Sequence, residues 1–422
     1  MAFDLILRQA HLVGREAEPT DIGIADGRIA AIAPALSGDA NAEEQLDGRL
    51  VLPGLVETHI HLDKSGIIDR CTISAGTVQE AIAETARAKA AFTEADIEAR
   101  ARRTLEKAIL AGTQHMRTHV EVDPRIGLKS FDVLRRLKRD YAWALDLQLC
   151  VFPQEGLIND PGTEELLVAA CKQGADLIGG CPYADTHAHE HIARIFAIAR
   201  RFDLDIDFHL DFDLDPSWMH LDEVIRQTGV HRYGGRVAVG HVTKLSAMSP
   251  EAQAVMARRL AETGIALTVL PATDLFLMGR DAAHNVPRGV TRADKFLAAG
   301  VTCSLATNNV LNPFTPFGDA CLMRMANLYA NIAQLGRPEE LARCLDMVSA
   351  AAARLMRVED YGVAVGNPAD LVVLPCRSGP SAVAEIARPL WGMKRGRRTF
   401  RHGEGELLRP DSRSPLAGRG LG

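Results

Sequence analysis

Two histidines, His59 and His61, follow a short apolar run and are the residues of this chain best suited to chemistry. The run covers residues 50–56 and is interrupted only by Pro53-Gly54. Side chains alternate along a strand, so two residues at positions i and i+2 face the same side, and both imidazoles can reach one point. Paired neutral nitrogen donors at the end of a parallel strand are typical of a metal site. The alternative is a pair of surface histidines, and the apolar lead-in argues against it.

Polar residues close the other apolar runs of the chain as well. A (β/α)8 barrel collects its functional groups where its strands end. The residues that close these runs are His119, Gln154, His209, His241, Asp274, Asn308 and Asn309. A single histidine at a strand end is more often structural than a ligand. Several at the same end of one barrel favour a zinc or ferrous iron centre.

The middle of the chain, about residues 53–357, has the pattern of a parallel barrel. Apolar runs of strand length alternate with amphipathic helical segments about eight times, as in ADIEARARRTLEKAILAG followed by HMRTHVEV. We therefore predict the α/β class and a (β/α)8 TIM barrel.

Both chain ends are predicted to be rich in β-structure. Residues 1–52 alternate in short segments separated by turn signals such as Asp26-Gly27, and GNPADLVVLPC near the other end reads as a strand. The expected organisation is a small β-sandwich domain built from both chain ends around the barrel. Its expected segments are 1–52 for the first part of the sandwich, 53–357 for the barrel, 358–405 for the second part and 406–422 for a loose tail.

Composition narrows the class of protein. The chain has 422 residues, 47% hydrophobic and 24% charged, and a formal net charge of -6 with both signs interspersed. This balance does not favour nucleic acid or an anionic membrane as a partner. Eight scattered cysteines form no CxxC pair, which is typical of reduced thiols. There is no signal peptide pattern and no apolar run of membrane-spanning length. We expect a cytoplasmic protein.

Several motifs, taken in order, resemble the cytosine deaminase branch of the amidohydrolase superfamily, which also includes N-isopropylammelide amidohydrolase. They are HIHLD, THV, FPQEG, HLD, GHVTKLSAM and the long run from GRDAAHNVPRG to LATNNVLNPFTPFGDA. The resemblance covers nearly the whole chain. It implies a (β/α)8 barrel with a flanking β-sandwich, one divalent metal ion, zinc or iron, and a homo-oligomer.

The resemblance also implies roles for individual residues. His59, His61 and His209 would bind the metal ion, Gln154 would contact a pyrimidine-like ring, and His241 would orient the water that the metal ion activates. In relatives with two metal ions, the fourth strand ends in a bridging lysine or glutamate. Here it ends in Phe152-Pro153-Gln154, so one metal ion is expected.

The chain departs from this family at two catalytic positions. The family has a glutamate three residues after the third metal histidine, where this chain has Phe212, and an aspartate at the end of strand eight, where it has Asn308. Each such acid–base group contributes roughly 10²- to 10⁴-fold in rate. Asp211, Asp213, Asp274, Glu121 and Lys64 are candidate replacements, and His241 could serve as the base. Phe212 either stacks on a flat substrate or fills the space of the missing glutamate.

Two functions from different classes remain open on the sequence. The first is a metal-dependent hydrolase of a C–N bond in a small nitrogen heterocycle, with His241 and Asn308 in catalytic positions and Gln154, Phe212 and Asn309 next to the substrate. The second is a non-catalytic homologue that binds such a ligand without turnover. A base-flipping nucleic-acid deaminase would carry a PCxxC signature, which this chain lacks.

Overall fold

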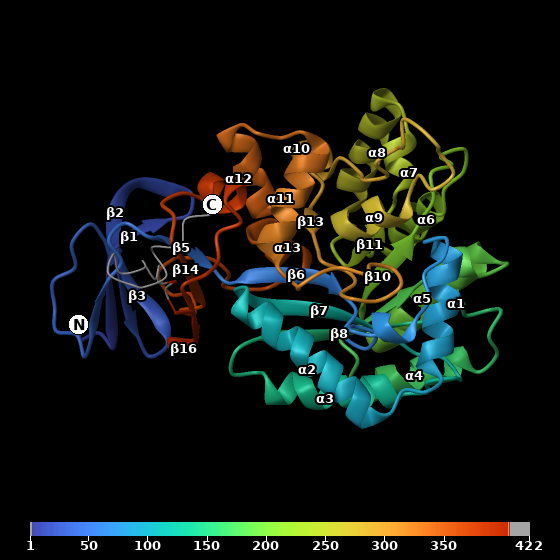
Figure 1. Ribbon diagram of the computed structural model, residues 1–422, viewed down its shortest axis with the longest axis horizontal. Helices are drawn as coiled ribbons and strands as arrows, with labels where there is room; N and C mark the ends of the chain where they lie inside the picture. Colours follow the sequence, from blue (N-terminus) through green and yellow to red (C-terminus); the bar gives the residue numbers. More distant parts are fainter. Residues whose placement is uncertain (1, 404, 406–422) are drawn as a thin grey trace, which may run out of the picture.

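The computed structural model describes residues 2–403 and residue 405, and the tail predicted at 406–422 lies outside the described residues. Two parts are visible in Figure 1. A β-rich lobe contains both the first and the last strands of the chain, and a larger α/β body carries the remaining strands and most helices.

The α/β body is the predicted barrel. Its eight strands are hydrogen-bonded in chain order, and all pairs between them are parallel. They are β6 (Leu55–Ile60), β7 (Thr113–Glu121), β8 (Asp146–Phe152), β9 (Leu177–Gly180), β10 (Asp205–Leu210), β11 (Val237–His241), β12 (Ile265–Val269) and β13 (Cys303–Leu305). A parallel bridge between Ile60 and Asn308 joins the first strand to the segment after the last. The sheet is thereby a nearly closed barrel.

Helices surround this barrel and follow its strands (Figure 1). The first group is α1 (Val78–Lys89), α2 (Glu94–Leu110), α3 (Lys129–Asp140), α4 (Thr163–Lys172), α5 (Ala188–Phe202), α6 (Leu221–His231) and α7 (Lys244–Ala247). The second is α8 (Pro250–Thr263), α9 (Pro271–Leu277), α10 (Ala293–Ala298), α11 (Leu322–Ala333), α12 (Pro338–Asp346), α13 (Ala350–Leu355) and α14 (Gly379–Ala384). Short 3₁₀ turns, η1 (Ile68–Arg70) and η2 (Pro182–Ala184), lie between them.

The strands from both chain ends share a second sheet, as predicted. It contains β1 (Leu5–Leu12), β2 (Arg15–Ala25), β3 (Arg28–Ala33), β4 (Glu43–Gln45), β5 (Leu50–Pro53), β14 (Leu371–Leu374), β15 (Trp391–Lys394) and β16 (Arg397–Arg401). Strand β5 lies between β1, its parallel neighbour, and β14, its antiparallel neighbour. Strand β5 therefore joins the N-terminal and C-terminal strands into one hydrogen-bonded sheet. Apolar residues that include Leu7, Ile22, Val51, Val373 and Trp391 form its core.

Strand β5 leads directly into the barrel through Gly54. A side chain at this glycine would overlap that of Gln114, the second residue of the neighbouring barrel strand β7. The Gln114 amide donates hydrogen bonds to the carbonyl oxygens of Leu371 and Met393 in the terminal sheet, at 3.2 and 2.9 Å. The barrel and the sheet thus meet closely at the point where the first metal-site strand begins.

Within the described residues, no helix is both long and apolar enough to cross a membrane. All eight cysteines lie in this part of the chain, and none is in a disulfide.

Candidate metal centre

Three histidines converge at the C-terminal end of the barrel. His59 lies in β6, His61 directly follows that strand, and His209 lies in β10. The Nε2 atom of His209 is 3.0 Å from Nε2 of His59 and 3.1 Å from Nε2 of His61. All three side chains are almost fully buried. The structure therefore brings together the three residues for which sequence predicted metal binding.

These imidazoles are electrically suited to receive a cation. Burial and the neighbouring histidines lower the pKa of His59 well below its usual value, and burial is also the main cause of the lowered pKa values of His61 and His209. Neutral imidazoles keep a lone pair for a metal ion. In the described structure the Nδ1 atoms of all three rings are buried without a hydrogen-bond partner.

A fourth buried histidine, His119 of β7, lies against this group. Its ring stacks on that of His59 with centroids 3.7 Å apart. One nitrogen each from His59, His119 and His209 lie within 4.8 Å of one another. Neither nitrogen of His119 has a hydrogen-bond partner in the described structure, although its Nε2 is 3.6 Å from Asp207. Sequence placed His119 at a strand end without assigning it a role.

His241 is held in one orientation by a buried carboxylate. It ends β11, and its Nδ1–H donates to Asp274 Oδ1 at 2.6 Å. Burial raises the pKa of Asp274, and the interaction with His241 opposes that rise. The second ring nitrogen of His241 faces the side-chain amide of Asn308, with Nε2 and Nδ2 3.5 Å apart. Such a histidine–carboxylate pair sets the tautomer so that Nε2 can accept a proton.

The expected position of Asp274 at a strand end is wrong. Strand β12 ends at Val269, and Asp274 lies within helix α9. Pro271 occupies the first turn of this helix, where a proline costs no hydrogen bond. The Asp274 carboxylate also accepts from the Leu270 backbone N–H at 3.2 Å, so its helical position leaves it beside His241.

Asn308 is anchored by its backbone between the first two histidines. Its N–H donates to the His59 carbonyl oxygen, and its own carbonyl oxygen accepts from the His61 N–H, both at 2.9 Å. This parallel bridge explains why Asn308 contributes to the site although β13 ends at Leu305. The side-chain Oδ1 is buried and has no hydrogen-bond partner in the described structure.

Backbone strain is concentrated at this end of the barrel. Asp211, His241, Val242 and Asn308 have φ values of 48°, 69°, 45° and 58°. A positive φ is unusual for a residue with a side chain and is a marked outlier for β-branched valine. Strain of this kind gathers at functional sites, because the surrounding structure must be rigid enough to impose it.

Phe212 covers His241 at the outer side of the site. The two ring centroids are 3.8 Å apart, and Phe212 belongs to an apolar cluster with Ala81, Leu277, Met278 and Phe314. Ala81 comes from α1 and Leu277 from α9. Phe212, which stands where the resemblance predicts a glutamate, is therefore part of an apolar cluster to which α1 and α9 contribute side chains.

Gln154 follows β8, which is the third strand of the barrel and not the fourth, as the sequence had suggested; the fourth strand, β9, ends at Gly180 and has no lysine or glutamate there. Gln154 belongs to a polar corner with Lys64. Its Oε1 accepts from Lys64 Nζ at 3.1 Å, and Lys64 also donates to Glu121 at 2.7 Å. Its Nε2 faces Cys181 Sγ at 3.6 Å. Phe152 links this corner to the histidines, because its ring stacks on His209 with centroids 4.6 Å apart.

Asn309 lies in different surroundings from Asn308. Its Oδ1 accepts from Asn312 Nδ2 at 2.7 Å. It lines an apolar cavity of about 380 Å³ with residues of α9 and α11, among them Phe276 and Met325. No contact in the described structure joins its side chain to the site histidines, so its predicted place next to the substrate remains a prediction.

Two further residues of the site had no distinctive sequence signal. Glu57 shares the inward face of β6 with His59 and accepts from Thr307 N–H and Oγ1–H; burial raises its pKa to about 7. Gly240 lies beside His209 in the β10–β11 register. A Cβ at Gly240 would lie 3.0 Å from Cε1 of His59. The sequence indicates that Gly240 belongs to the site only because Gly240 directly precedes His241.

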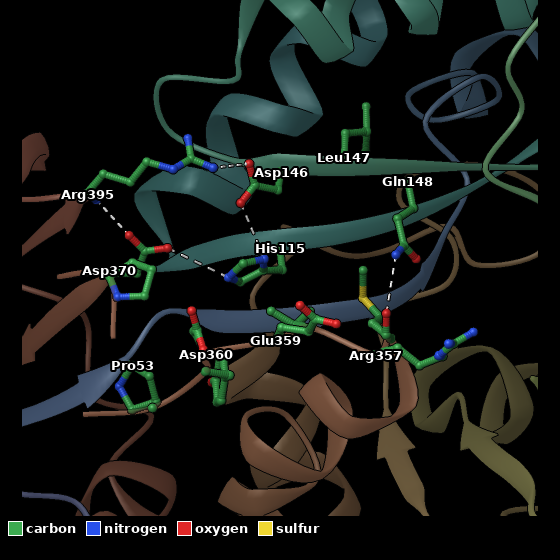
Figure 2. A pocket seen from close by; sticks show the side chains of 15 residues that line it. Pro53, His115, Asp146, Leu147, Gln148, Arg357, Glu359, Asp360, Asp370 and Arg395 are labelled. Carbon is green, nitrogen blue, oxygen red and sulfur yellow. Dashed lines mark hydrogen bonds and ion pairs between the residues drawn. The ribbon is translucent and has the colours of Figure 1, made fainter. Parts of the chain in front are cut away.

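A separate group of His115 with two acidic residues lies where the barrel meets the terminal sheet. Figure 2 shows His115 between Asp146 and Asp370 in a cavity of about 320 Å³. Lys394 Nζ is 2.8 Å from Asp146 and 2.9 Å from the Asp370 carboxylate. The lysine already supplies the cation that these two carboxylates require, so this cluster is an ion-pair junction between the two parts of the chain.

The group at the C-terminal end is the one that fits a metal ion. It offers converging imidazole nitrogens, an adjacent amide oxygen without a partner, and a histidine–carboxylate pair next to them. Imidazole-rich sites suit zinc and iron among the divalent ions. Three histidines are also sufficient to hold a catalytic zinc ion with one position open.

Comparison with known proteins gives consistent results. Residues 43–145 and 134–404 match the sequence profile described as "Amidohydrolase family". N-isopropylammelide isopropyl amidohydrolase of Pseudomonas sp. (strain ADP) is 27% identical over 403 residues, covering 94% of this chain and 96% of that relative. Pterin deaminase of Rhizobium rhizogenes is 28% identical and covers 85% of this chain and 82% of that relative. The crystal structure of 5-methylcytosine deaminase from Klebsiella pneumoniae liganded with 5-fluorocytosine has a TM-score of 0.90 at 29% identity, covering 96% and 99% of the two chains.

Proposed function

The chain belongs to the amidohydrolase family, and from this premise we propose that it is a metal-dependent hydrolase that cleaves a C–N bond of a small nitrogen heterocycle. The reaction we propose is either a deamination or the hydrolysis of an amide or amidine. The relatives act, by their names, on N-isopropylammelide, pterin and 5-methylcytosine, and these flat nitrogen rings define the substrate class we propose.

One observation carries this proposal. The Nε2 atoms of His59 and His61 approach Nε2 of His209 within 3.0 and 3.1 Å at the end of a barrel where active sites lie. We propose these three residues as the ligands of one zinc or iron ion, with His119 as a neighbouring donor. Such an ion activates water at neutral pH.

In this proposal, residues of the chain transfer the protons and position the substrate. His241, kept in one tautomer by Asp274, accepts a proton from water at Nε2 and returns it to the departing nitrogen. Asn308 cannot accept a proton, but its amide can donate a hydrogen bond toward His241 Nε2. Phe212 provides an apolar surface for a flat ring, and Gln154 provides a polar contact to its edge.

A second candidate function is supported by the same two substitutions. Phe212 is packed against His241 and has no acid–base capacity, and Asn308 stands where the family has a carboxylate. A homologue that binds a heterocycle without turnover would have this arrangement.

Elemental analysis of the purified protein tests the proposed metal site, and a turnover assay then separates the two candidate functions. We expect about one zinc or iron ion per chain, lost in the His59→Ala/His61→Ala double variant. Turnover is then tested with cytosine, 5-methylcytosine, N-isopropylammelide and pterin. Bound metal with turnover supports the hydrolase. Bound metal and heterocycle without turnover would favour the binding protein, and a chain that takes up no metal even after supplementation would contradict the proposed site.

We further propose a cytoplasmic homo-oligomer. Eight free cysteines support a reducing compartment, and the resemblance to the cytosine deaminase branch supports self-association. Light scattering coupled to size-exclusion chromatography tests the second part, and a monomeric mass would contradict it.

A further inference from the structure

Lys64 is a buried cation at the edge of the candidate site, and the proposed reaction does not yet use it. It follows the HIHLD motif, and its side chain is 2% exposed. Its ammonium donates to Glu121 and Gln154, at 2.7 and 3.1 Å, and lies 4.4 Å from the ring centroid of Phe314. An ammonium has three N–H donors, and in the described residues these contacts engage two of them.

A second buried lysine holds this arrangement in place. Lys89 of α1 donates to the other oxygen of Glu121 at 2.7 Å and to Asp123 and Glu155 at 2.5 and 2.7 Å. Glu121 is therefore shared by two lysines, and its carboxylate holds the ammonium of Lys64 in place. The same helix contributes Ala81 to the apolar cover around Phe212 and Phe314.

The other buried carboxylates near the histidines already have partners. Asp207 pairs through Oδ2 with Arg117 at 2.7 Å, although its Oδ1 has no hydrogen-bond partner in the described structure, and Asp274 accepts from His241. With Asn308 in place of a carboxylate, the three proposed ligands His59, His61 and His209 are all neutral, so none of them offsets the charge of a divalent ion. An uncompensated buried charge is costly, so a negatively charged ligand would bind here more favourably than a neutral one.

We propose that Lys64 and Gln154 form the corner of the site that recognises an anionic oxygen of the substrate ring. The preferred ligand is a planar oxo-heterocycle with an ionised ring amide, its oxygen on Lys64 and its ring against Phe212 and Phe314. Lys89, which touches Glu121 and not the ligand, is the positioning residue. This inference rests on the proposed function, because it concerns the same site.

Isothermal titration calorimetry of the full-length, zinc-supplemented protein tests the inference. The probes are barbiturate, a flat ring that is an anion at mildly alkaline pH, and cytosine, which is neutral there. We expect barbiturate to bind at least about tenfold more tightly. A hydrogen bond to a charged group corresponds to about 10- to 100-fold in affinity, so Lys64→Met should remove this preference and Lys64→Arg should retain part of it.

Matched variants separate recognition from folding. Lys394→Met removes another fully buried lysine that pairs with two carboxylates, at the far junction, and should leave the ratio of the two Kd values unchanged. Gln154→Glu is isosteric and places a second carboxylate beside Lys64, so it should abolish barbiturate binding selectively even if Lys64→Met does not fold. Lys89→Met should reduce the ratio, and Lys89→Arg should restore it, whereas a purely structural defect would weaken both ligands equally.

The results distinguish a failure of anion recognition by Lys64 from a failure of the proposed hydrolase function. Equal affinities in the unmodified protein, a ratio unaffected by Lys64→Met and Gln154→Glu, or no binding of either probe would overturn the inference. A Lys64-dependent preference for barbiturate in a protein that turns over no heterocycle would support the inference and contradict the hydrolase.

Discussion

At the residue scale, Phe212 and Asn308 are the positions where this chain differs from the residues that its resemblance to the cytosine deaminase branch predicts. Phe212 packs on His241, and the Asn308 amide faces the same ring. Both therefore contact the histidine that we propose to move a proton. The backbone of Asn308 is bonded to His59 and His61, so its replacement by an isosteric aspartate should not disturb the site geometry.

Restoring the two family residues should raise activity. We expect Phe212→Glu with Asn308→Asp to turn over cytosine well above background, because each restored acid–base group contributes roughly 10²- to 10⁴-fold. Ammonia release measures the gain. Phe212→Gln with Asn308→Asp is the matched control, since it has the same shape without the new proton shuttle. No difference between the two double variants would show that other residues separate this chain from the deaminases.

Gly240 tests whether the position of His59 matters for the metal ion. A methyl group there would lie 3.0 Å from Cε1 and 3.1 Å from Nδ1 of His59, so Gly240→Ala should push the ring away from His209. We expect roughly tenfold weaker zinc binding, the lower end of what outer contacts of a metal site contribute. Competition with a chromophoric chelator measures it. Gly229→Ala, which would contact no other atom, should bind zinc normally; equal loss in both would discount the role of Gly240.

At the element scale, the first barrel strand connects the two parts of the molecule. Strand β5 ends at Pro53 in the terminal sheet, and only Gly54 separates it from β6, which begins at Leu55 and carries His59 toward its other end. The Gln114 side chain fills the space beside Gly54 and reaches across to β14 and β15. The order of the elements thus places the most constrained glycine of the junction close to the strand that carries His59.

A side chain at Gly54 should destabilise this junction. Gly54→Ala would overlap the Gln114 side chain, and overpacking of this kind costs roughly 1–3 kcal/mol in free energy of unfolding. Urea denaturation followed by circular dichroism measures the loss. In the Gln114→Gly background the same substitution should cost much less, because the Oε1, Cδ and Cβ atoms of Gln114 that obstruct it are all gone. An equal cost in both backgrounds would mean that the strain lies elsewhere.

At the scale of the whole molecule, a cluster of charged residues around the buried His115 joins the barrel and the terminal sheet. His115 of β7 is 3.6 Å from Asp146 and 3.9 Å from Asp370, and Arg395 contacts the same two carboxylates (Figure 2). Lys394 also pairs with both carboxylates. Burial, with Lys394, lowers the pKa of His115 to about 4, although both carboxylates oppose this. The folded protein therefore keeps this imidazole neutral.

This junction should make the folded state sensitive to acid. As pH falls from neutral to about 4, His115 takes up its proton first in the unfolded chain, whose histidine pKa is about 6.5, so stability is lost across that window and levels off below it. His115→Gln should remove up to roughly 3 kcal/mol of this pH-dependent loss. Urea midpoints at several pH values measure it, with the exposed His189→Gln as control. Parallel curves for the unmodified protein and His115→Gln would contradict the prediction.

The sequence by itself determined the fold class and supplied the candidate metal ligands that the structure brings together. Strand and helix periodicity are local properties, so the alternating runs predicted the parallel barrel, and the HxH spacing placed His59 and His61 on one face of a strand. Turn signals and position along the chain predicted that both ends share a β-domain. The two departures, Phe212 and Asn308, were also visible in the letters alone.

Only the tertiary structure decided how these residues meet. The His241–Asp274 pair joins a strand to a helix 33 positions later, and sequence wrongly put that aspartate at a strand end. The stacking of His119 on His59, the bridge that draws Asn308 into the site and the Lys64–Glu121–Lys89 network depend on contacts between strands and helices far apart in the chain. Packing sets such contacts, because the identity of a buried polar residue does not specify its partner.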